Sequence, residues 1–177
     1  SDITSKELVI NTGKTLSVAD GVTVTTGNFV NNGAIVIGND ANFVQKKGAI
    51  NTGGGSATVY RHSEVSADRE QYTLWSSPVT GQSVYGLYAS GQPVPPNRAF
   101  TYNTLNDFYK VVPTGTNFAP GVGYSIKEPA SESANAKFTG TLNNGDITVP
   151  LDNTSGSAPY YNLIGNPYPS EIDITTV

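Results

Sequence analysis

The chain has 177 residues and a formal net charge of −4, and charged residues make up only 14% of it. Its 10 Lys and Arg residues are scattered, which excludes the basic patch of a nucleic-acid-binding protein. The absence of cysteine excludes disulfides, thiolate metal sites and a cysteine nucleophile. No apolar run approaches the roughly 18 residues of a membrane-spanning helix, and the absence of methionine leads us to expect a processed or excised chain.

Residues 1–60 repeat one short unit, an apolar strand followed by a few polar residues and a glycine. Three units make a coil of about 20 residues, so 8–28 and 29–48 are expected to be successive coils. The fixed period and the short strands predict a parallel β-solenoid, similar to a β-helix, rather than an α-helix. The strands of the unit fall at 8–10, 16–18, 22–24, 29–30, 34–37 and 43–44.

Polar residues mark the expected corners and the end of the solenoid. Asp20 and Asp40 lie one coil apart and are expected to stack at corresponding corners. Residues 57–61 indicate one more strand, and the polar stretch that starts at His62 breaks the pattern. We therefore divide the chain into a solenoid at 1–61 and a second domain at 62–177. Because two and a half coils are too few to bury a continuous core, the following domain or another chain is expected to cap them.

The second domain has longer strands with different turn signals. The sequence Asn143-Asn144-Gly145 predicts a hairpin turn between 138–142 and 147–151. About eight strands at this spacing predict an antiparallel β-sandwich of the jelly-roll kind. They are expected at 71–76, 84–88, 99–102, 108–112, 124–127, 137–142, 146–151 and 161–164.

Several longer phrases together resemble one group of proteins. The phrase LVINTGKTLSVADGVTVTTGNFVNNGAIVI resembles the repeat regions of very large secreted proteins of Bacteroidota that use the type IX secretion system. The phrases YTLWSSPVTGQ, FAPGVGYSIKEP, FTGTLNNGDITVPL and YNLIGNPYPSEID resemble a module that follows such repeats. The resemblance implies export to the cell surface or the medium. It also implies that the module continues past GNPYPS, so that the sandwich is incomplete at the C-terminus of this chain.

One function and two alternatives follow from the pattern and the resemblance. We expect a non-enzymatic extracellular protein, structural or adhesive, that forms part of a cell-surface stalk, filament or adhesin. It would assemble through β-strand edges, with other copies of itself or neighbouring domains of a larger surface protein as partners. The first alternative is a carbohydrate-binding module that contacts glycans. The second, a polysaccharide hydrolase or lyase, would need more coils to form a catalytic groove.

Few residues are suited to catalysis, and we predict no catalytic residue. His62 is the single histidine, and no nucleophile-elbow motif accompanies it. A glycoside hydrolase needs two carboxylates at a fixed separation, but most acidic residues here lie in or beside turns, where Asp caps the backbone. The carboxylates considered are Asp68, Glu70, Asp107, Asp146, Asp152, Glu171 and Asp173.

Calcium is the one metal that the sequence suggests, because surface β proteins bind it through Asp, Asn and carbonyl oxygens. Asp40 and Asn42 in one turn, and Asn144 and Asp146 in another, have the right ligand types. Neither turn matches an EF-hand or a Gly-Gly-x-Gly-x-Asp repeat, and solvated turns are the simpler interpretation. No other cofactor is expected.

Aromatic side chains suggest sugar binding, because their faces stack on pyranose rings. Tyr85 and Tyr88 lie near the Gly- and Pro-rich loop at 90–97 and are the ligand-binding candidates. Packing inside the protein is the competing interpretation for both. Trp75 lies among apolar neighbours and is expected in the core.

Overall fold

The chain folds almost entirely into β-strands and loops. The computed structural model describes residues 1–63, 71–129, 135–153 and 161–175. Within these ranges there is no α-helix, and the 3-10 turn η1 (Val84–Gly86) is the only helical element. The prediction of an all-β protein is therefore confirmed. No described segment is a helix long and apolar enough to cross a membrane.

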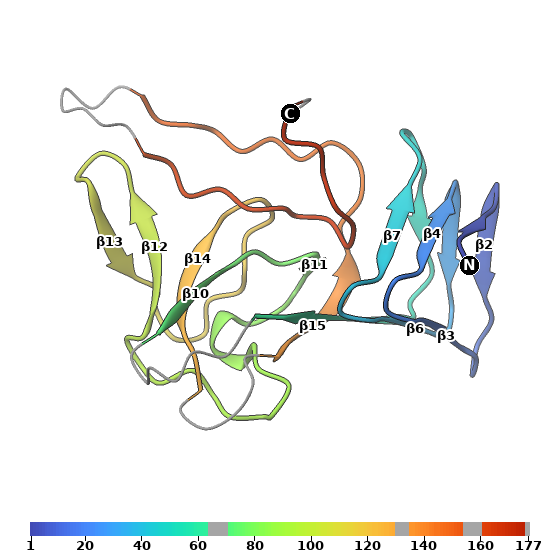
Figure 1. The fold of residues 1–177 in the computed structure, drawn as a ribbon, viewed down its shortest axis with the longest axis horizontal. Helices are drawn as coiled ribbons and strands as arrows, with labels where there is room; N and C mark the ends of the chain where they lie inside the picture. The colour runs from blue at the N-terminus through green and yellow to red at the C-terminus, as the bar shows by residue number, and fades with distance from the viewer. Residues whose placement is uncertain (64–70, 130–134, 154–160, 176–177) are drawn as a thin grey trace.

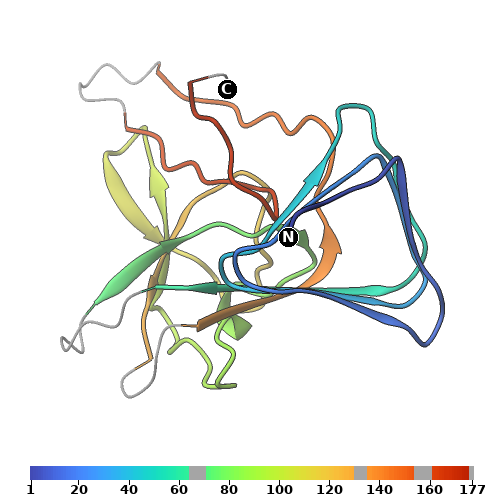
Figure 2. The ribbon, with the colours of Figure 1, turned by 45° about the vertical axis from the view of Figure 1, so that its right-hand side comes forward.

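Residues 3–62 wind through three parallel sheets, which we call the N-terminal stack (Figure 1). Each strand pairs with the strand three places later, giving the orders β1-β4-β7, β2-β5-β8 and β3-β6-β9. Figure 2 shows this winding as superposed triangles. The strands are β1 (Ile3–Thr4), β2 (Glu7–Ile10), β3 (Thr15–Val18), β4 (Thr23–Thr26), β5 (Asn28–Asn31), β6 (Ala34–Ile37), β7 (Asn42–Gln45), β8 (Asn51–Thr52) and β9 (Ser56–His62).

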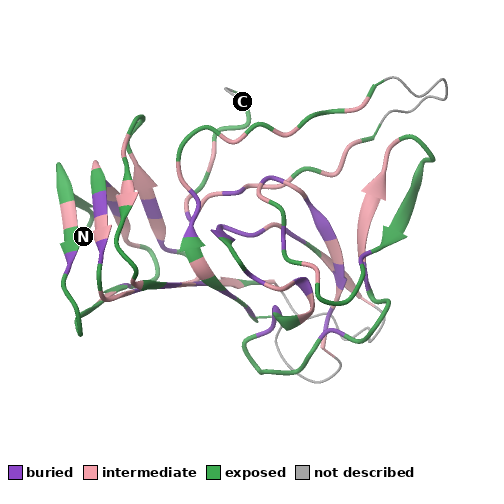
Figure 3. Ribbon diagram, turned by 180° about the vertical axis from the view of Figure 1, so that it is seen from behind, coloured by how far each residue is buried: buried purple, intermediate pink, exposed green. Residues whose placement is uncertain are grey.

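The interior of the stack is apolar because side chains alternate between the two faces of each strand. Val24, Phe29, Ile35 and Phe43 are almost completely buried, and Figure 3 shows the buried bands along the strands. The rings of Phe29 and Phe43, on neighbouring sheets, lie 4.9 Å apart. Each such buried side chain contributes about 1.5–3 kcal/mol, so the stack is stabilised mainly by contacts between successive turns.

The corners bring successive turns into close contact. A Cβ at Gly38 would collide with the carboxylate of Asp20 and lie 3.1 Å from backbone atoms of Val18 and Asp20, so glycine favours the close contact between this turn and the preceding one. Beside it, the N–H of Gly21 donates to the carbonyl of Asp40 over 3.3 Å. Asp20 and Asp40 thus lie at successive corners but one residue out of register, because Val18 pairs with Ile37 and Thr23 with Asn42, so the expected stacking of the two aspartates on each other is wrong.

Strand β9 links the stack to the rest of the chain. It pairs in parallel with β6 on one edge and antiparallel with β15 (Asn135–Leu142) on the other. Val59 in β9 therefore lies between Ile37 and Phe138. With β11 (Val79–Thr80) beyond β15, the result is one five-stranded sheet, β11-β15-β9-β6-β3.

A second sheet, entirely antiparallel, faces this one. Its order is β10-β14-β12-β13, with β10 (Tyr72–Trp75), β12 (Ala99–Asn103), β13 (Phe108–Val111) and β14 (Tyr124–Lys127). The rings of Trp75 and Phe138 meet between the two sheets at 6.2 Å, and those of Phe118 and Phe138 at 5.7 Å. Trp75 is thus in the core, as predicted. Neither sheet closes on itself, and two facing sheets are consistent with a β-sandwich.

Three expected strands and the expected hairpin are wrong. Residues 84–88 contain η1 instead of a strand, 146–151 form none, and 161–164 contribute only an isolated bridge at Ile164. The hairpin fails because both edges of β15 are occupied. One edge pairs with β9, while the other meets Leu87–Ala89, the side chain of Gln82 and then β11.

The turn residues themselves serve other contacts. The buried amide of Asn143 donates to the carbonyls of Ser77 and Pro167 at 3.1 and 2.9 Å. The Asn144 amide donates to the carbonyl of Ala49 at 2.7 Å. The two asparagines therefore anchor distant backbone segments instead of closing a two-residue turn.

Candidate functional site

The GNPYPS phrase, residues 165–170, packs against the end of the N-terminal stack that β7, β8 and β9 form, which we call the downstream end. Its two prolines, Pro167 and Pro169, are buried. The Phe43 N–H on the edge of β7 donates to the Pro169 carbonyl at 3.0 Å, and the Glu171 N–H donates to the side chain of Asn42 at 2.9 Å. Because Pro and Gly suit an irregular extended path, this segment covers part of the β7 edge without forming a regular strand.

A turn within the phrase fixes its path. The Tyr168 N–H donates to Asn166 Oδ1 at 2.9 Å, which is an Asx-turn contact. The Tyr168 hydroxyl then donates to the Gly145 carbonyl at 2.6 Å. Tyr168 thereby links the phrase to the loop that follows β15.

Arg61, at the end of β9, holds the stack and the GNPYPS phrase together. Its guanidinium donates to the carbonyls of Gly38 and Ala41 at one corner of the stack and to that of Pro169, at 2.9, 3.2 and 3.1 Å. Further bonds reach the carbonyls of Asn39 and Tyr60. All five bonds come from Nη1 and Nη2, whose four N–H groups are shared among the five carbonyls.

The electrostatics of Arg61 follow from its position. Burial lowers the pKa of Arg61, and the nearby carboxylates of Asp40 and Asp20 oppose that effect. Because an Arg side chain starts from a very high pKa, it stays charged in this site. Sequence reasoning missed the role of Arg61. The available signal was an arginine at the end of a strand that otherwise alternates apolar and polar residues.

The downstream edge of every sheet in the stack meets a later part of the chain. Residues 169–171 cover β7, and β15 pairs along β9. On the remaining sheet, the Asn51 amide of β8 donates to the carbonyl of Leu142, the last residue of β15, at 3.2 Å. Later parts of the chain therefore contact this end of the stack at all three of its sheets.

The opposite end of the stack, which β1, β2 and β3 form and which we call the upstream end, is different. Strands β1, β2 and β3 each pair with one neighbour, and no described strand lies on their outer edges. Ile3 and Val9 are 49% and 47% exposed there. Leu8 and Leu16 are only partly buried against the core. Another set of strands could pair with the unpaired N–H and C=O groups of these edges and cover the apolar interior next to them.

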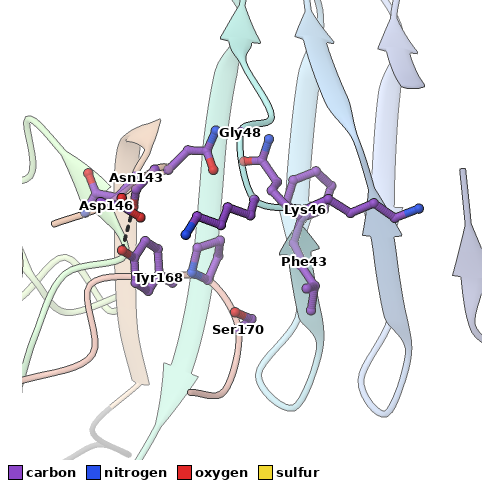
Figure 4. Close-up of a pocket in the computed structure, with 13 residues that line it drawn as sticks. Phe43, Lys46, Gly48, Asn143, Asp146, Tyr168 and Ser170 are labelled. Carbon is purple, nitrogen blue, oxygen red and sulfur yellow. Dashed lines mark hydrogen bonds between the residues drawn. The ribbon is translucent and has the colours of Figure 1, made fainter. Parts of the chain in front are cut away.

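A groove of about 280 Å³ lies between the stack and the loop after β15 (Figure 4). Phe43, Lys46 and Gly48 line one wall, and Asn143, Asp146 and Tyr168 line the other. The walls combine an ammonium group, a carboxylate and the edge of β7. Among the lining residues there is no His and only one carboxylate, that of Asp146; we call this space the junction groove.

The structure separates the four calcium candidates into two places. Asn144 and Asp146 line the junction groove, whereas Asp40 and Asn42 line a shallower one beside Arg61. The Asn42 side-chain oxygen already accepts the Glu171 N–H. Within the described residues, no three His, Asp or Glu side chains gather closely enough to hold a metal ion. The guanidinium of Arg61 beside Asp40 supplies positive charge there instead.

The catalytic candidates do not converge. His62 is exposed, and its Nδ1 lies 2.6 Å from the Asn135 side-chain oxygen. Asp107 binds the hydroxyl of Tyr102, and Asp173 accepts two hydrogen bonds from Thr175, which lower the pKa of Asp173. Asp68 and Glu70 lie outside the described residues.

The two ligand-binding candidates, Tyr85 and Tyr88, pack against the core of the protein. Tyr88 is 5% exposed, its hydroxyl donates to the Lys127 carbonyl at 2.9 Å, and burial raises its pKa. Tyr85 is half-buried against the core and donates to the Val112 carbonyl at 2.5 Å. Of the two interpretations left open for Tyr88, packing inside the protein is therefore the one that the structure shows. Each hydroxyl finds a backbone acceptor across the core, as buried tyrosines require.

A different set of aromatic residues lies nearer the surface, three of them half-buried and Tyr109 exposed, and sequence reasoning missed them. Tyr72, Phe100, Tyr109 and Tyr102 form a row across β10, β12 and β13. The available signal was the alternation of Phe100 and Tyr102 in one strand, opposite Tyr109 in the next. We call this row the aromatic face.

The comparisons with known proteins give one match. The family described as a domain of unknown function, DUF8693, matches residues 1–177 and so spans both the stack and the two facing sheets. No curated protein and no solved structure matches significantly. The chain therefore belongs to the DUF8693 family.

Proposed function

We propose that this chain is a non-enzymatic structural module of an extracellular or cell-surface protein. In this proposal the N-terminal stack is a short β-solenoid, residues 1–61, and a β-sandwich, residues 62–177, closes one end of it. The observation that carries the proposal is the contrast between the covered downstream end and the open upstream end. A module of this kind terminates a solenoid.

The mechanism is association through strand edges. Further strands of the same short pattern, from another copy or from a neighbouring part of a larger surface protein, would pair with β1, β2 and β3 and bury Leu8 and Leu16. The downstream end cannot accept them, because β15, Leu142 and residues 169–171 occupy it. Growth from one end only would place the sandwich at the end of a stalk or filament.

The low charge of the chain and the resemblance of its phrases to secreted Bacteroidota proteins support an exported location. The dispersed catalytic candidates support a role without chemistry.

The decisive experiment is a tandem duplication of residues 8–28, which inserts one complete turn in phase with the strands. If the stack is a solenoid, the inserted turn pairs with both neighbours, and the free energy of unfolding rises. The measurement is urea unfolding followed by circular dichroism. A Gly/Ser-rich insert of equal length is the matched control and should lower stability. A duplicated turn that unfolds in a separate transition, or that destabilises as much as the control, would refute the solenoid.

Self-assembly is tested by the native mass of the protein in a dilution series measured by light scattering. We expect association that grows with concentration and that a Val9→Lys substitution reduces. This charge on β2 disfavours edge pairing while leaving the covered end intact. A concentration-independent mass of 18.6 kDa would exclude other copies as the partner.

A further inference from the structure

The aromatic face is built on the outer side of the sheet β10-β14-β12-β13. Alternation decides which side chains lie there, because Trp75, Ala99 and Ile126 are buried on the inner side. Phe100 and Tyr102 therefore point outward, and their cross-strand partners Val111 and Tyr109 share that side.

The rings follow one another without a gap. Centroid distances are 5.8 Å from Tyr72 to Phe100, 6.5 Å from Phe100 to Tyr109, and 5.4 Å from Tyr109 to Tyr102. Tyr109 is 49% exposed, and Leu74 at the border of the row is 59% exposed. Cross-strand aromatic pairs do stabilise sheets, but pairing alone does not require so much apolar surface to remain in water.

The polar groups of the face indicate what it binds. Arg98 donates to the Tyr72 hydroxyl at 3.1 Å, the Lys127 ammonium lies 5.6 Å from the centre of the Tyr72 ring, and the Tyr102 hydroxyl donates to Asp107. Positive groups thus lie at one end of the row and a carboxylate at the other. This distribution favours a ligand without net charge that can both donate and accept hydrogen bonds.

We propose that the aromatic face binds a linear neutral polysaccharide. Pyranose rings present apolar C–H faces for stacking and hydroxyls for the charged groups at both ends of the row. Neighbouring rings of the row are tilted by 58° to 76° to one another, so they do not form one flat platform; the exposed Tyr109 ring offers the face for stacking, and the other three rings border it. The site does not depend on the open end of the stack, and it would give a structural module a means of attachment.

The test is affinity gel electrophoresis of the full chain in gels that contain hydroxyethyl cellulose, xylan or laminarin. We expect at least one of these neutral glycans to retard the protein. Replacing the exposed ring in Tyr109→Leu should weaken binding by about two- to tenfold, because it removes the aromatic face on which a sugar stacks. Tyr109→Phe keeps the ring and should retain most of the binding.

Two controls separate the ring contact from general effects. Tyr60→Leu alters a half-buried tyrosine on the other sheet and should leave retardation unchanged. Thermal unfolding of each variant shows whether the fold survives, and Phe100→Leu provides a second test of the row. Absence of retardation by all three glycans, or equal retardation of Tyr109→Leu and the wild type, would overturn the proposal. So would a dimer that Tyr109→Leu dissociates, because the face would then be a self-association surface.

Discussion

The N-terminal stack and the facing sheets bury their apolar residues in different ways. In the stack each strand pairs with an equivalent strand about 20 residues later, so one local pattern fixes every contact. In the facing sheets the key pairs join residues far apart in the chain, such as Val59 with Phe138. The stack is therefore modular, whereas the sheets depend on closure by distant segments. β9 belongs to both regions, so it joins the repeated strand pairing of the stack to the long-range strand pairing of the facing sheets.

The strongest test of this comparison is Phe138→Ala. Phe138 is completely buried and contacts Trp75, Phe118 and the β9 partner Val59. Truncation should cost about 3–5 kcal/mol. Because β15 covers the β9 edge, we expect the stack to lose its cap and to unfold in the same transition. Urea unfolding followed by Trp75 fluorescence and by far-ultraviolet circular dichroism checks this. Two separated transitions in the wild type would show that the regions are independent.

Arg61→Met tests the link between the regions more selectively. The substitution keeps much of the side-chain length but removes the donors for five carbonyls. We expect a loss of about 3 kcal/mol, because hydrogen bonds to a charged group contribute roughly 1.5–3 kcal/mol and buried acceptors would be left without partners. Chemical denaturation gives the value. Arg98→Met, at a more exposed arginine, is the matched control and should cost far less. Equal losses would mean that Arg61 is not the link.

The comparison also explains how much the sequence could predict. Most strands of the stack were predictable because most corners carry Gly or Asn and the strands bury alternate apolar residues, so that local and global preferences agree. The two-residue strands β1 and β8 were missed because they are too short to show that pattern. The hairpin prediction at residues 143–151 was wrong because Asn-Gly after a β-strand favours a hairpin only locally. Only the folded chain shows that Leu87–Ala89, Gln82 and β11 already occupy that edge of β15.

Side-chain exposure was harder still to predict. Tyr85 and Tyr88 were ligand-binding candidates because a Gly- and Pro-rich loop follows them, with packing inside the protein as the competing interpretation. η1 instead turns Tyr88 inward, and its hydroxyl reaches the backbone of β14. Which tyrosines face water depends on which sheet covers them, and no short segment contains that information.

Asn143 and Asn144 provide a comparison between adjacent residues. The buried Asn143 amide joins Ser77 to Pro167 across the facing sheets, whereas the half-buried Asn144 amide makes one bond to Ala49 in the stack. We expect Asn143→Ala to cost about 2 kcal/mol and Asn144→Ala about 1 kcal/mol, because burial raises the cost of the acceptors left unpaired. Thermal unfolding of both variants gives the difference. The reverse order would mean that the junction with the stack contributes more than the anchoring of Pro167.

The smallest expected effect concerns Tyr102 on the aromatic face, far from the junction. Its hydrogen bond to Asp107 raises the pKa of Tyr102 to about 12. Because this folded-state pKa lies above the ordinary value of about 10, the interaction stabilises fully below about pH 10 and is lost as the pH rises through about 12. Asp107→Asn removes the negative charge and should return the pKa of Tyr102 toward its ordinary value. The change is read from phenolate absorbance during a pH titration, with Tyr102→Phe subtracted to isolate this residue. Asp146→Asn, in the junction groove, is the control and should leave that titration unchanged. If Asp146→Asn shifts the pKa of Tyr102 as much as Asp107→Asn does, the charge of the whole protein, rather than the contact with Asp107, determines that pKa.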